Sequence, residues 1–474
     1  MKTASSGLDH RTVWRWHFYA GLFCIPFILW LSVTGTIFLF HPQIQRWLDR
    51  PYAHLTTIGA PAPVSDQVRV ALAAVPGSGL HAYQLPFTDE APAQVLVGKG
   101  LKEFRVYVHP RTLQVLKVDD EDKRIDKFVS RLHGELLIGN LGSWIVELAA
   151  SWAVIMIVTG LFLWWPTSSK GVAGVLYPRL RQGQRIFWRD IHAVTGIYIS
   201  VFALFLLFTG LPWAKSWGGY LKAVRRITGT APVKQDWVTS SKAEIAARST
   251  PADTMDGMDM GGMDMSSPEH AEHRKHMTTA GQGSASYGQI DTMVGVVAPL
   301  HLTNPVLVSP PRRPGGNWTA KSDTRDRPLR VDLVLDPHTG AILQRTDFRQ
   351  KALLDRIVGT GIAAHEGQLF GLANQLLGLF TTLGLVTLSL SGLVMWWRRR
   401  PEGVLGAPAP IRRIRFSAGL IVFLVVFGVY MPFLGVSLVL VALTERFVLR
   451  RIPATRLWLG LYPGIPKEAA TLRV

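Results

Sequence analysis

The sequence is almost free of cysteine: its 474 residues include one, Cys24, which lies inside an apolar run. A single cysteine cannot build a disulfide framework, a CxxC redox motif or a cysteine-rich metal site. The sequence also has no convincing GxGxxG motif between a strand and a helix, so we expect no integral dinucleotide- or flavin-binding domain. Any redox chemistry would therefore need a bound cofactor and an electron donor outside the chain.

Acidic residues are also scarce relative to basic ones. The sequence has 33 Asp and Glu and 51 Lys and Arg, which gives a formal net charge of +18. Such a charge is compatible with nucleic-acid binding. Lys and Arg concentrate beside the apolar runs, however, so we interpret the charge as membrane topology and contact with anionic lipid. The hydrophobic content of 48% and the positive mean hydropathy indicate a membrane protein with sizeable water-facing domains.

Four apolar runs, at 18–40, 145–165, 191–213 and about 369–397, are each long enough to cross a hydrocarbon core of about 30 Å as a helix. A further run at 416–449 is too long for one ordinary span and is interrupted at "VYMPFLG". We favour two short helices that cross and return there, with a kinked or re-entrant hairpin as the alternative. The connections after the second and fourth runs are rich in arginine, which predicts that both are cytoplasmic.

The predicted organisation follows from this topology, with both termini in the cytoplasm. It comprises a cytoplasmic start and first transmembrane helix (1–41), an outer domain (42–140), a second helix (141–166), a cytoplasmic loop (167–187), a third helix (188–213), a second outer domain (214–364), a fourth helix (365–398), a cytoplasmic loop (399–415), a C-terminal transmembrane hairpin (416–450) and a cytoplasmic tail (451–474).

The two outer segments contain matching strand patterns. "EFRVYVHPRTLQVLKV" and "PLRVDLVLDPHTGAILQRTDF" each alternate apolar and polar residues around a turn, as an antiparallel hairpin requires. We therefore expect a small α+β module in each outer segment. The stretch 250–285 differs, because its Gly, Asp, Ser and Met residues cannot bury a core, and it should be a disordered loop.

An internal repeat relates the two halves of the chain. An offset of 232 residues aligns the second run with the fourth, and an offset of 175 aligns the first with the third, so the chain is a duplicated unit of helix, outer domain and helix. Parallel repeats of this kind are related by a pseudo-twofold axis along the membrane normal. The matched residues include His133 with His365, Gly160 with Gly392, His17 with His192, and Thr34-Gly35 with Thr209-Gly210.

The repeat predicts two histidine pairs in a four-helix core: His17 with His192, the inner pair, near the cytoplasmic face, and His133 with His365, the outer pair, near the other face. A lone histidine at a membrane boundary is often an ordinary interface residue. Two symmetric pairs favour axial ligation of haem iron by imidazoles from facing helices. A zinc or copper site is the weaker alternative, because no cysteine or carboxylate repeats beside them.

Small residues of the repeat lie near both pairs. Gly35 and Gly210 fall toward the outer pair and Gly160 and Gly392 toward the inner pair, where the lack of a side chain could let a macrocycle approach a helix. Ordinary packing of small residues between membrane helices is the alternative explanation.

Several other residues are candidates for supporting roles. Glu147 lies in the second run and is a candidate for proton coupling or a polar cofactor contact, unless it only reaches water. Arginines close to the histidines could pair with haem propionates, and tryptophans at the ends of two runs fit aromatic-belt anchors. The arginines are Arg15, Arg131 and Arg189, and the tryptophans are Trp164, Trp165, Trp396 and Trp397.

The predicted disordered loop is a candidate copper site. Its thioether and imidazole groups suit Cu(I) and Cu(II) respectively, and the alternative is a flexible polar insertion. The candidate ligands are Met255, Met258, Met260, Met263, Met265, His270, His273 and His276.

Four segments carry a resemblance to a known family: "WRWHFYAGLFCIPFILWLSVTG", "LHGELLIGNLG" with "VTGLFLWWP", "FWRDIHAVTGIYISVFALFLLFTG", and "AAHEGQLFG" with "LSGLVMWW". They resemble the PepSY-associated transmembrane family, also called iron-regulated membrane proteins, which includes bacterial ferric-siderophore reductases. The outer hairpins look like PepSY-type modules.

This resemblance implies an α-helical protein of the bacterial cytoplasmic (inner) membrane, with a four-helix haem-binding core, a C-terminal helical hairpin and two small α+β periplasmic domains. It implies two b-type haems per chain, with His17, His133, His192 and His365 as axial ligands. The implied activity is reduction of a periplasmic ferric siderophore and release of Fe(II). The expected electron donor is a separate cytoplasmic reductase or a membrane quinol.

Three alternatives stay open at this point. The chain could be a periplasmic copper reductase or copper-handling protein, a noncatalytic PepSY binding module, or a transporter for a metal or siderophore. Haem content would distinguish the ferric-siderophore reductase from the binding module and from the transporter.

Overall fold

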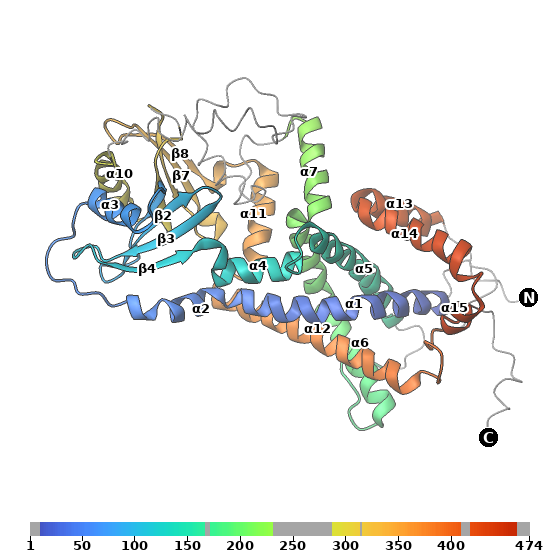
Figure 1. Cartoon of the computed structure of the whole chain (residues 1–474). Helices are drawn as coiled ribbons and strands as arrows, with labels where there is room; N and C mark the ends of the chain where they lie inside the picture. The colour runs from blue at the N-terminus through green and yellow to red at the C-terminus, as the bar shows by residue number, and fades with distance from the viewer. Residues whose placement is uncertain (1–9, 166–170, 231–286, 313–314, 409–417, 462–474) are drawn as a thin grey trace, which may run out of the picture. The chain divides into compact units, whose positions relative to one another are not determined.

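The computed structural model describes residues 10–165, 171–230, 287–312, 315–408 and 418–461. The chain divides into two compact units (Figure 1). The helical unit takes the described residues of Met1–Phe40, Val129–Val238 and Ala364–Val474, and the sheet unit takes those of His41–Phe128 and Thr239–Ala363.

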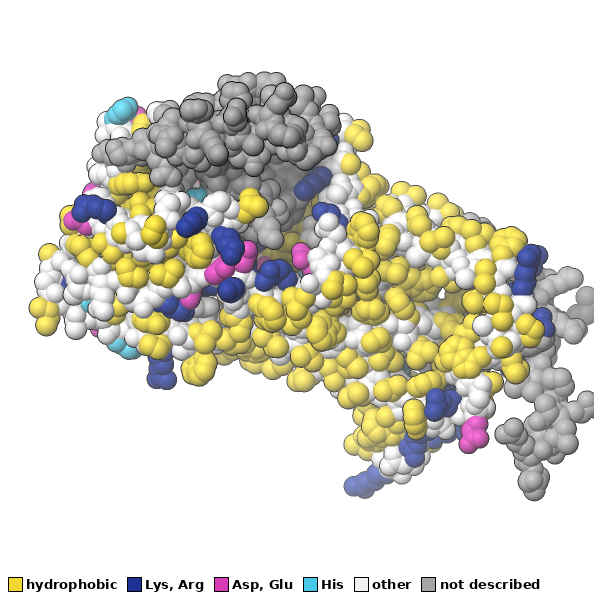
Figure 2. All heavy atoms as spheres, in the orientation of Figure 1, with side chains coloured by type: hydrophobic (Ala, Val, Ile, Leu, Met, Phe, Trp, Pro, Cys, Tyr) yellow, Lys and Arg dark blue, Asp and Glu magenta, His cyan; other side chains and the backbone are white. Residues whose placement is uncertain are grey.

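Four long helices form the centre of the helical unit. They are α1 (His10–Leu39), α5 (Asn140–Trp164), α6 (Gln184–Gly210) and α12 (Leu372–Arg399), and they cover most of each of the four apolar runs predicted from the sequence. Each is long and apolar enough to cross a membrane. Figure 2 shows hydrophobic side chains over most of the visible surface of this unit, with Lys and Arg where α6 begins and α12 ends. Because so much apolar surface is exposed and not buried in the core, this unit is typical of a helical membrane protein.

The four helices pack as two equivalent pairs. Helix α1 lies against α5 and α6 lies against α12, while contacts of α1 with α12 and of α5 with α6 join the pairs. Small and hydroxyl side chains such as Ala153, Ser151 and Ser391 are buried at these contacts. Membrane helices associate through such residues because lipid offers no hydrophobic driving force between them. The packing follows the repeat seen in the sequence.

Each half places a short helix and a glycine break before its second span. Helix α4 (Ile125–Glu135) precedes α5, and α11 (Leu353–His365) precedes α12. The residues at the breaks, Gly139 (φ 65°, ψ −135°) and Gly371 (φ 57°, ψ −133°), have nearly the same conformation. Glycine reaches this region without strain, which accounts for glycine at both positions. The breaks put His133 and His365 near the ends of the short helices.

The C-terminal stretch folds into two short helices, α13 (Ala418–Tyr430) and α14 (Pro432–Thr444), as the sequence predicts. Pro432 starts α14 after a non-helical Met431, and a Cβ on Gly435 would lie 3.1 Å from the Gly428 carbonyl oxygen. At 13 residues, α13 is shorter than the roughly 20 residues that a span needs. Among the described residues, five helices therefore qualify as candidate spans, where the sequence predicts six.

The sheet unit holds one eight-stranded antiparallel sheet, in the order β4-β3-β2-β1-β5-β6-β7-β8. The first outer segment supplies β1 (Gly79–Gln84), β2 (Ala93–Lys99), β3 (Lys102–Val108) and β4 (Val115–Asp120). The second supplies β5 (Val306–Ser309), β6 (Trp318–Ser322), β7 (Val331–Leu335) and β8 (Ile342–Asp347). The predicted hairpins are β3–β4 and β7–β8.

Pairing of β1 with β5 joins the two outer segments into one domain. Tyr83 pairs with Val308, and the core behind the sheet combines residues of both segments such as Val95 and Leu333. Helices α3 (Val64–Ala74) and α10 (Gln289–Val297) supply Val68 and other buried residues to the same core. The two modules expected from the sequence thus share a single sheet and a single core.

Short helices complete the description. They are α2 (His41–Leu48), α7 (Lys215–Ile227) and α15 (Pro453–Trp458), the single turns at Arg50–Tyr52, Glu121–Lys123, Leu211–Trp213, Ala298–Leu300, Arg327–Leu329 and Phe348–Gln350, and a π-helical turn at Glu445–Leu449.

Candidate functional site

The inner pair comes together as the repeat predicts. His17 from α1 and His192 from α6 have ring centres 6.2 Å apart, with the ring planes at 80°. Because a metal–imidazole bond is about 2.0–2.1 Å long, a metal ion held between two imidazole nitrogens sets the ring centres about 6 Å apart. The separation of the two rings therefore suits one metal ion between them.

Each inner histidine directs Nδ1 at the second span of its own half. The ring contacts a main-chain carbonyl oxygen, which can only accept, so Nδ1 carries the proton and Nε2 keeps its lone pair. His17 Nδ1 lies 2.9 Å from Met156 O and 3.2 Å from Thr159 Oγ1, and His192 Nδ1 lies 3.1 Å from both Leu388 O and Ser391 Oγ.

The outer histidines follow the same rule with hydroxyl partners. His133 Nδ1 lies 2.9 Å from Thr34 Oγ1, and His365 Nδ1 lies 2.9 Å from Thr209 Oγ1. Thr34 donates its own proton to the Trp30 carbonyl at 2.9 Å, so its oxygen is the acceptor for His133. Within the described part of the chain, none of the four histidines has a hydrogen bond to Nε2. Four neutral imidazoles thus present the same free nitrogen.

The outer histidines are half-buried and close enough for the charge of one to affect the pKa of the other. Burial lowers the pKa of His133 to about 4. Burial, reinforced by the charge on a protonated His133, lowers the pKa of His365 to about 4 as well. The Trp213 ring lies against His365, with the ring centres 5.8 Å apart. Both rings are therefore neutral at pH 7, which is the form in which imidazole binds a metal.

A glycine of the adjacent helix lies against every one of these histidines. A Cβ on Gly160 would lie 3.0 Å from Cε1 of His17, and a Cβ on Gly392 would lie 3.5 Å from Cε1 of His192. At the outer pair the distances are 3.3 Å from Gly35 to His133 and 3.4 Å from Gly210 to His365. The imidazoles therefore crowd the space of a side chain at Gly160 and Gly35, whereas an added Cβ at Gly392 or Gly210 would make a contact of ordinary length.

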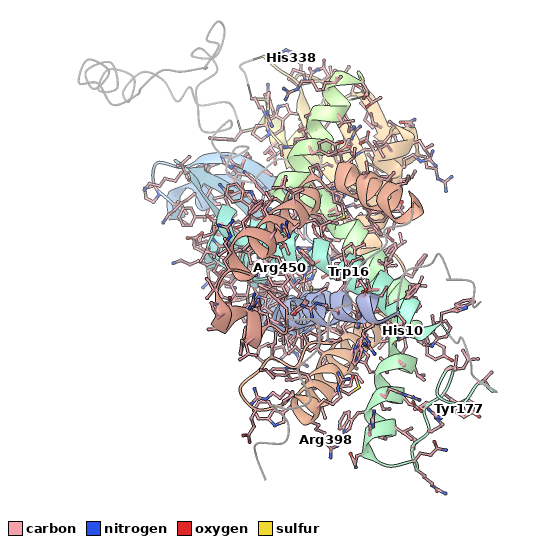
Figure 3. The ribbon with its side chains drawn as sticks, turned by 90° about the vertical axis from the view of Figure 1, so that its right-hand side faces the viewer. His10, Trp16, Tyr177, His338, Arg398 and Arg450 are labelled. Atoms are coloured by element: carbon pink, nitrogen blue, oxygen red, sulfur yellow. The ribbon has the colours of Figure 1, made fainter. Side chains whose placement is uncertain are left out.

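The inner pair lines a cavity of about 770 Å³. This volume falls within the range of about 300–1,000 Å³ that is usual for ligand and cofactor sites. Figure 3 labels His10, Tyr177 and Arg398 in the lower right of the view; His10 itself lines the cavity, as do Val175 and Arg399, which are close in sequence to the other two. The free Nε2 atoms of His17 and His192 and the size of the cavity together fit a metal-centred macrocycle.

The basic residues around the cavity differ in part from those predicted. Arg189 lines the cavity, but it shares the fully buried carboxylate of Asp190 with Arg179, at 2.6 and 2.7 Å. Arg15 donates instead to the carbonyls of Pro408 and Gly460, at 2.7 and 2.9 Å, and ties α1 to the C-terminal segment. Arg179, which sequence reasoning missed, holds the 171–183 loop at this end of the unit.

Arg131, the third arginine predicted to pair with a propionate, lies in α4 two residues before His133 and is half-buried. Its pairing with a propionate stays a prediction.

Glu147 has a structural role that the sequence did not reveal. Its carboxylate accepts hydrogen bonds from the main-chain N–H groups of Ser216 at 2.8 Å and Trp217 at 3.0 Å. These groups belong to the first turn of α7, where a negative charge stabilises the helix. Glu147 therefore caps α7, and the repeat partner Leu379 needs no carboxylate.

The tryptophans divide into two kinds. Trp164 and Trp396 line the cavity and donate to the carbonyls of Val175 and Leu405, at 3.0 and 2.9 Å. Trp165 and Trp397 are exposed, at 68% and 62%, as aromatic-belt residues are. The prediction of belt anchors thus fits only one tryptophan of each WW pair.

The Met-rich candidate copper site lies at 255–276, outside the described residues. Among the residues that the structure describes, no group of three or more His, Cys, Asp or Glu side chains could hold a metal ion.

Fold and site define a helical membrane protein with two symmetric histidine pairs in a four-helix core. The family model described as "PepSY-associated TM region" matches residues 14–399, and the chain therefore belongs to this family. The matched region spans all four histidines. A comparison with curated proteins found no match.

Proposed function

We propose that this chain is a di-haem, b-type electron-transfer protein that reduces a ferric siderophore at the outer face of the bacterial inner membrane. The observation that carries the proposal is the common state of the four histidines: each has Nδ1 hydrogen-bonded and Nε2 free, and each lies against a glycine. Fixing Nδ1 in this way is what proteins do with metal-ligating histidines.

The two pairs lie far enough apart to serve opposite faces of a membrane. Gly35, which packs against His133, follows His17 by 18 residues on the same helix, or about 27 Å at 1.5 Å per residue. Gly210 and His192 repeat this spacing on α6. The hydrocarbon core is about 30 Å thick, so each pair would lie near one of its boundaries.

When bound at each histidine pair, b-type haem would supply a one-electron carrier. The residues of the chain would hold, orient and insulate these carriers. The histidines would provide Nε2, the carbonyls and hydroxyls would fix the imidazole planes, and the apolar residues of the cavity wall would surround the carrier. Trp164 and Trp396 line the inner cavity and donate hydrogen bonds to the neighbouring loops.

The reaction also requires an electron donor and a ferric acceptor. One electron per ferric ion would come from a membrane quinol or a separate cytoplasmic reductase and pass from the inner to the outer pair. The ferric complex would become ferrous and release its ion for uptake. The resemblance of the sequence to a family that includes ferric-siderophore reductases favours this choice of substrate.

The test is a haem count on the purified full-length protein in detergent. Oxidised and dithionite-reduced visible spectra identify b-type haem, and pyridine extraction counts haem per chain. We expect about two haems, and reoxidation of the reduced protein by a ferric siderophore, with Cu(II) as the competing acceptor. Protein made with ample haem supply that still contains none would refute the proposal and favour a binding module or transporter.

A further inference from the structure

The four hydroxyls beside the histidines share one arrangement. Each belongs to a long helix and donates its proton to a carbonyl of its own helix, three or four residues back. The contacts are Thr159 to Ile155 at 2.7 Å, Ser391 to Leu388 at 3.0 Å, Thr34 to Trp30 at 2.9 Å and Thr209 to Phe205 at 2.6 Å. With its proton committed, each hydroxyl oxygen is left to accept from a histidine Nδ1–H.

We infer that these four hydroxyls are positioning residues that set the reduction potentials of the two haems. The inference rests on the proposed function, because it assigns the four histidines as axial ligands. The repeat supports it: Thr159 and Ser391 are equivalent at an offset of 232, and Thr34 and Thr209 at an offset of 175. Threonine and serine differ in shape and share only the hydroxyl, so the hydroxyl is the feature common to the two halves.

The physical effect is on the charge of the ligating nitrogen. A hydrogen bond accepted from Nδ1–H draws the proton away from the ring and makes Nε2 a stronger donor to iron. A stronger donor stabilises ferric more than ferrous iron, which lowers the reduction potential. Removing the acceptor should therefore raise the potential of the haem concerned and leave the other haem unchanged.

The four positions differ in how much they depend on the hydroxyl. Thr34 makes the one hydrogen bond to His133 Nδ1 found among the described residues. His17 has the Met156 carbonyl at 2.9 Å in addition to Thr159 at 3.2 Å. Loss of the Thr34 hydroxyl should therefore raise the potential more than loss of the Thr159 hydroxyl does.

The experiment is a redox titration of purified full-length variants, followed through the haem absorbance. Thr34→Val removes the hydroxyl with little change in shape, Thr34→Ser restores it, and Thr159→Val tests the weaker dependence. Thr387→Val is the matched control, since the Thr387 hydroxyl donates to the Leu383 carbonyl in the same way and, among the described residues, has no hydrogen bond to a histidine. Haem per chain is measured on every variant.

We expect Thr34→Val to raise one of the two potentials, Thr159→Val to raise the other by less, and Thr34→Ser and Thr387→Val to match the wild type. Loss of one haem in Thr34→Val with its retention in Thr34→Ser would support the same role. Unchanged potentials in Thr34→Val, or equal changes in Thr34→Ser, would overturn the inference. Wild-type protein without haem would instead refute the proposed function, so the two failures are distinguishable.

Discussion

Replacement of Gly160 by alanine tests whether the repeated glycines make room for ligating histidines. The new Cβ would lie 3.0 Å from Cε1 and 3.5 Å from Nδ1 of His17. Carbon atoms prefer separations of about 3.5–4.0 Å, so the ring would have to move by roughly 0.5–1 Å. That movement would break the geometry of the Nδ1 contacts to Met156 and Thr159, which are already 2.9 and 3.2 Å long.

The size of the effect follows from the cost of overpacking. Inserting a methyl group into a filled space costs about 1–3 kcal/mol. At 1.4 kcal/mol per factor of ten, haem at the inner pair should be held roughly 5- to 150-fold more weakly. Alanine within a helix is otherwise more stable than glycine by about 0.5–1 kcal/mol. We therefore expect loss of one haem from a protein that is still folded.

The assay is haem per chain after purification, together with the thermal unfolding temperature. Gly219→Ala is the control, because Gly219 also lies within a helix and has no atom within 4 Å of its added Cβ. Gly35→Ala should remove the other haem, since its Cβ would lie 3.3 Å from His133. A Gly160→Ala protein that keeps both haems at the wild-type ratio would show that the imidazole does not need this space.

Three further outcomes follow from the structure. His17→Ala should remove one haem and His133→Ala the other, as counted by pyridine extraction, and retention of both haems in each variant would contradict the ligand assignment. Glu147→Ala removes the cap of α7 and should lower the unfolding free energy by about 1 kcal/mol, seen as a lower unfolding temperature with unchanged haem content. Burial alone would raise the pKa of Asp126, but Arg325 at 3.0 Å and Arg124 lower it overall. Its folded pKa lies below the unfolded value of about 3.9, so its contribution to stability is complete above that pH and is lost as the pH falls further. Thermal unfolding from pH 6 to pH 3 should show a smaller acid-dependent loss in Asp126→Asn than in the wild type.

The sequence predicts the local elements of this fold well, because their signals are local. Apolar runs gave the four long helices, and alternation around a turn gave the hairpins β3–β4 and β7–β8. Pairing of β1 with β5 could not be predicted in this way, since two transmembrane helices, α5 and α6, separate these strands in the sequence. The residue pattern of a strand does not identify the strand with which it pairs. The sequence therefore predicts one module in each outer segment and does not predict the shared sheet.

The histidine positions were accessible for a different reason, which is the duplication. The two halves can be compared position by position. Residues that only pack differ between them, whereas residues with the same function recur at the same spacing. Glu147 is not repeated, because the equivalent residue of the other half is Leu379. Its carboxylate caps α7, a role that is needed only once in the chain.

The hydroxyls show where this reasoning stops. Thr34 and Thr209 match in sequence, yet a match alone cannot distinguish helix packing from a hydrogen bond to a histidine on another helix. Thr159 and Ser391 do not match by identity, and only the contacts at 3.2 and 3.1 Å reveal that they hold equivalent rings. The ligands of a symmetric site can therefore be found by comparing the halves of a sequence, whereas the groups that tune those ligands require the packing of the helices.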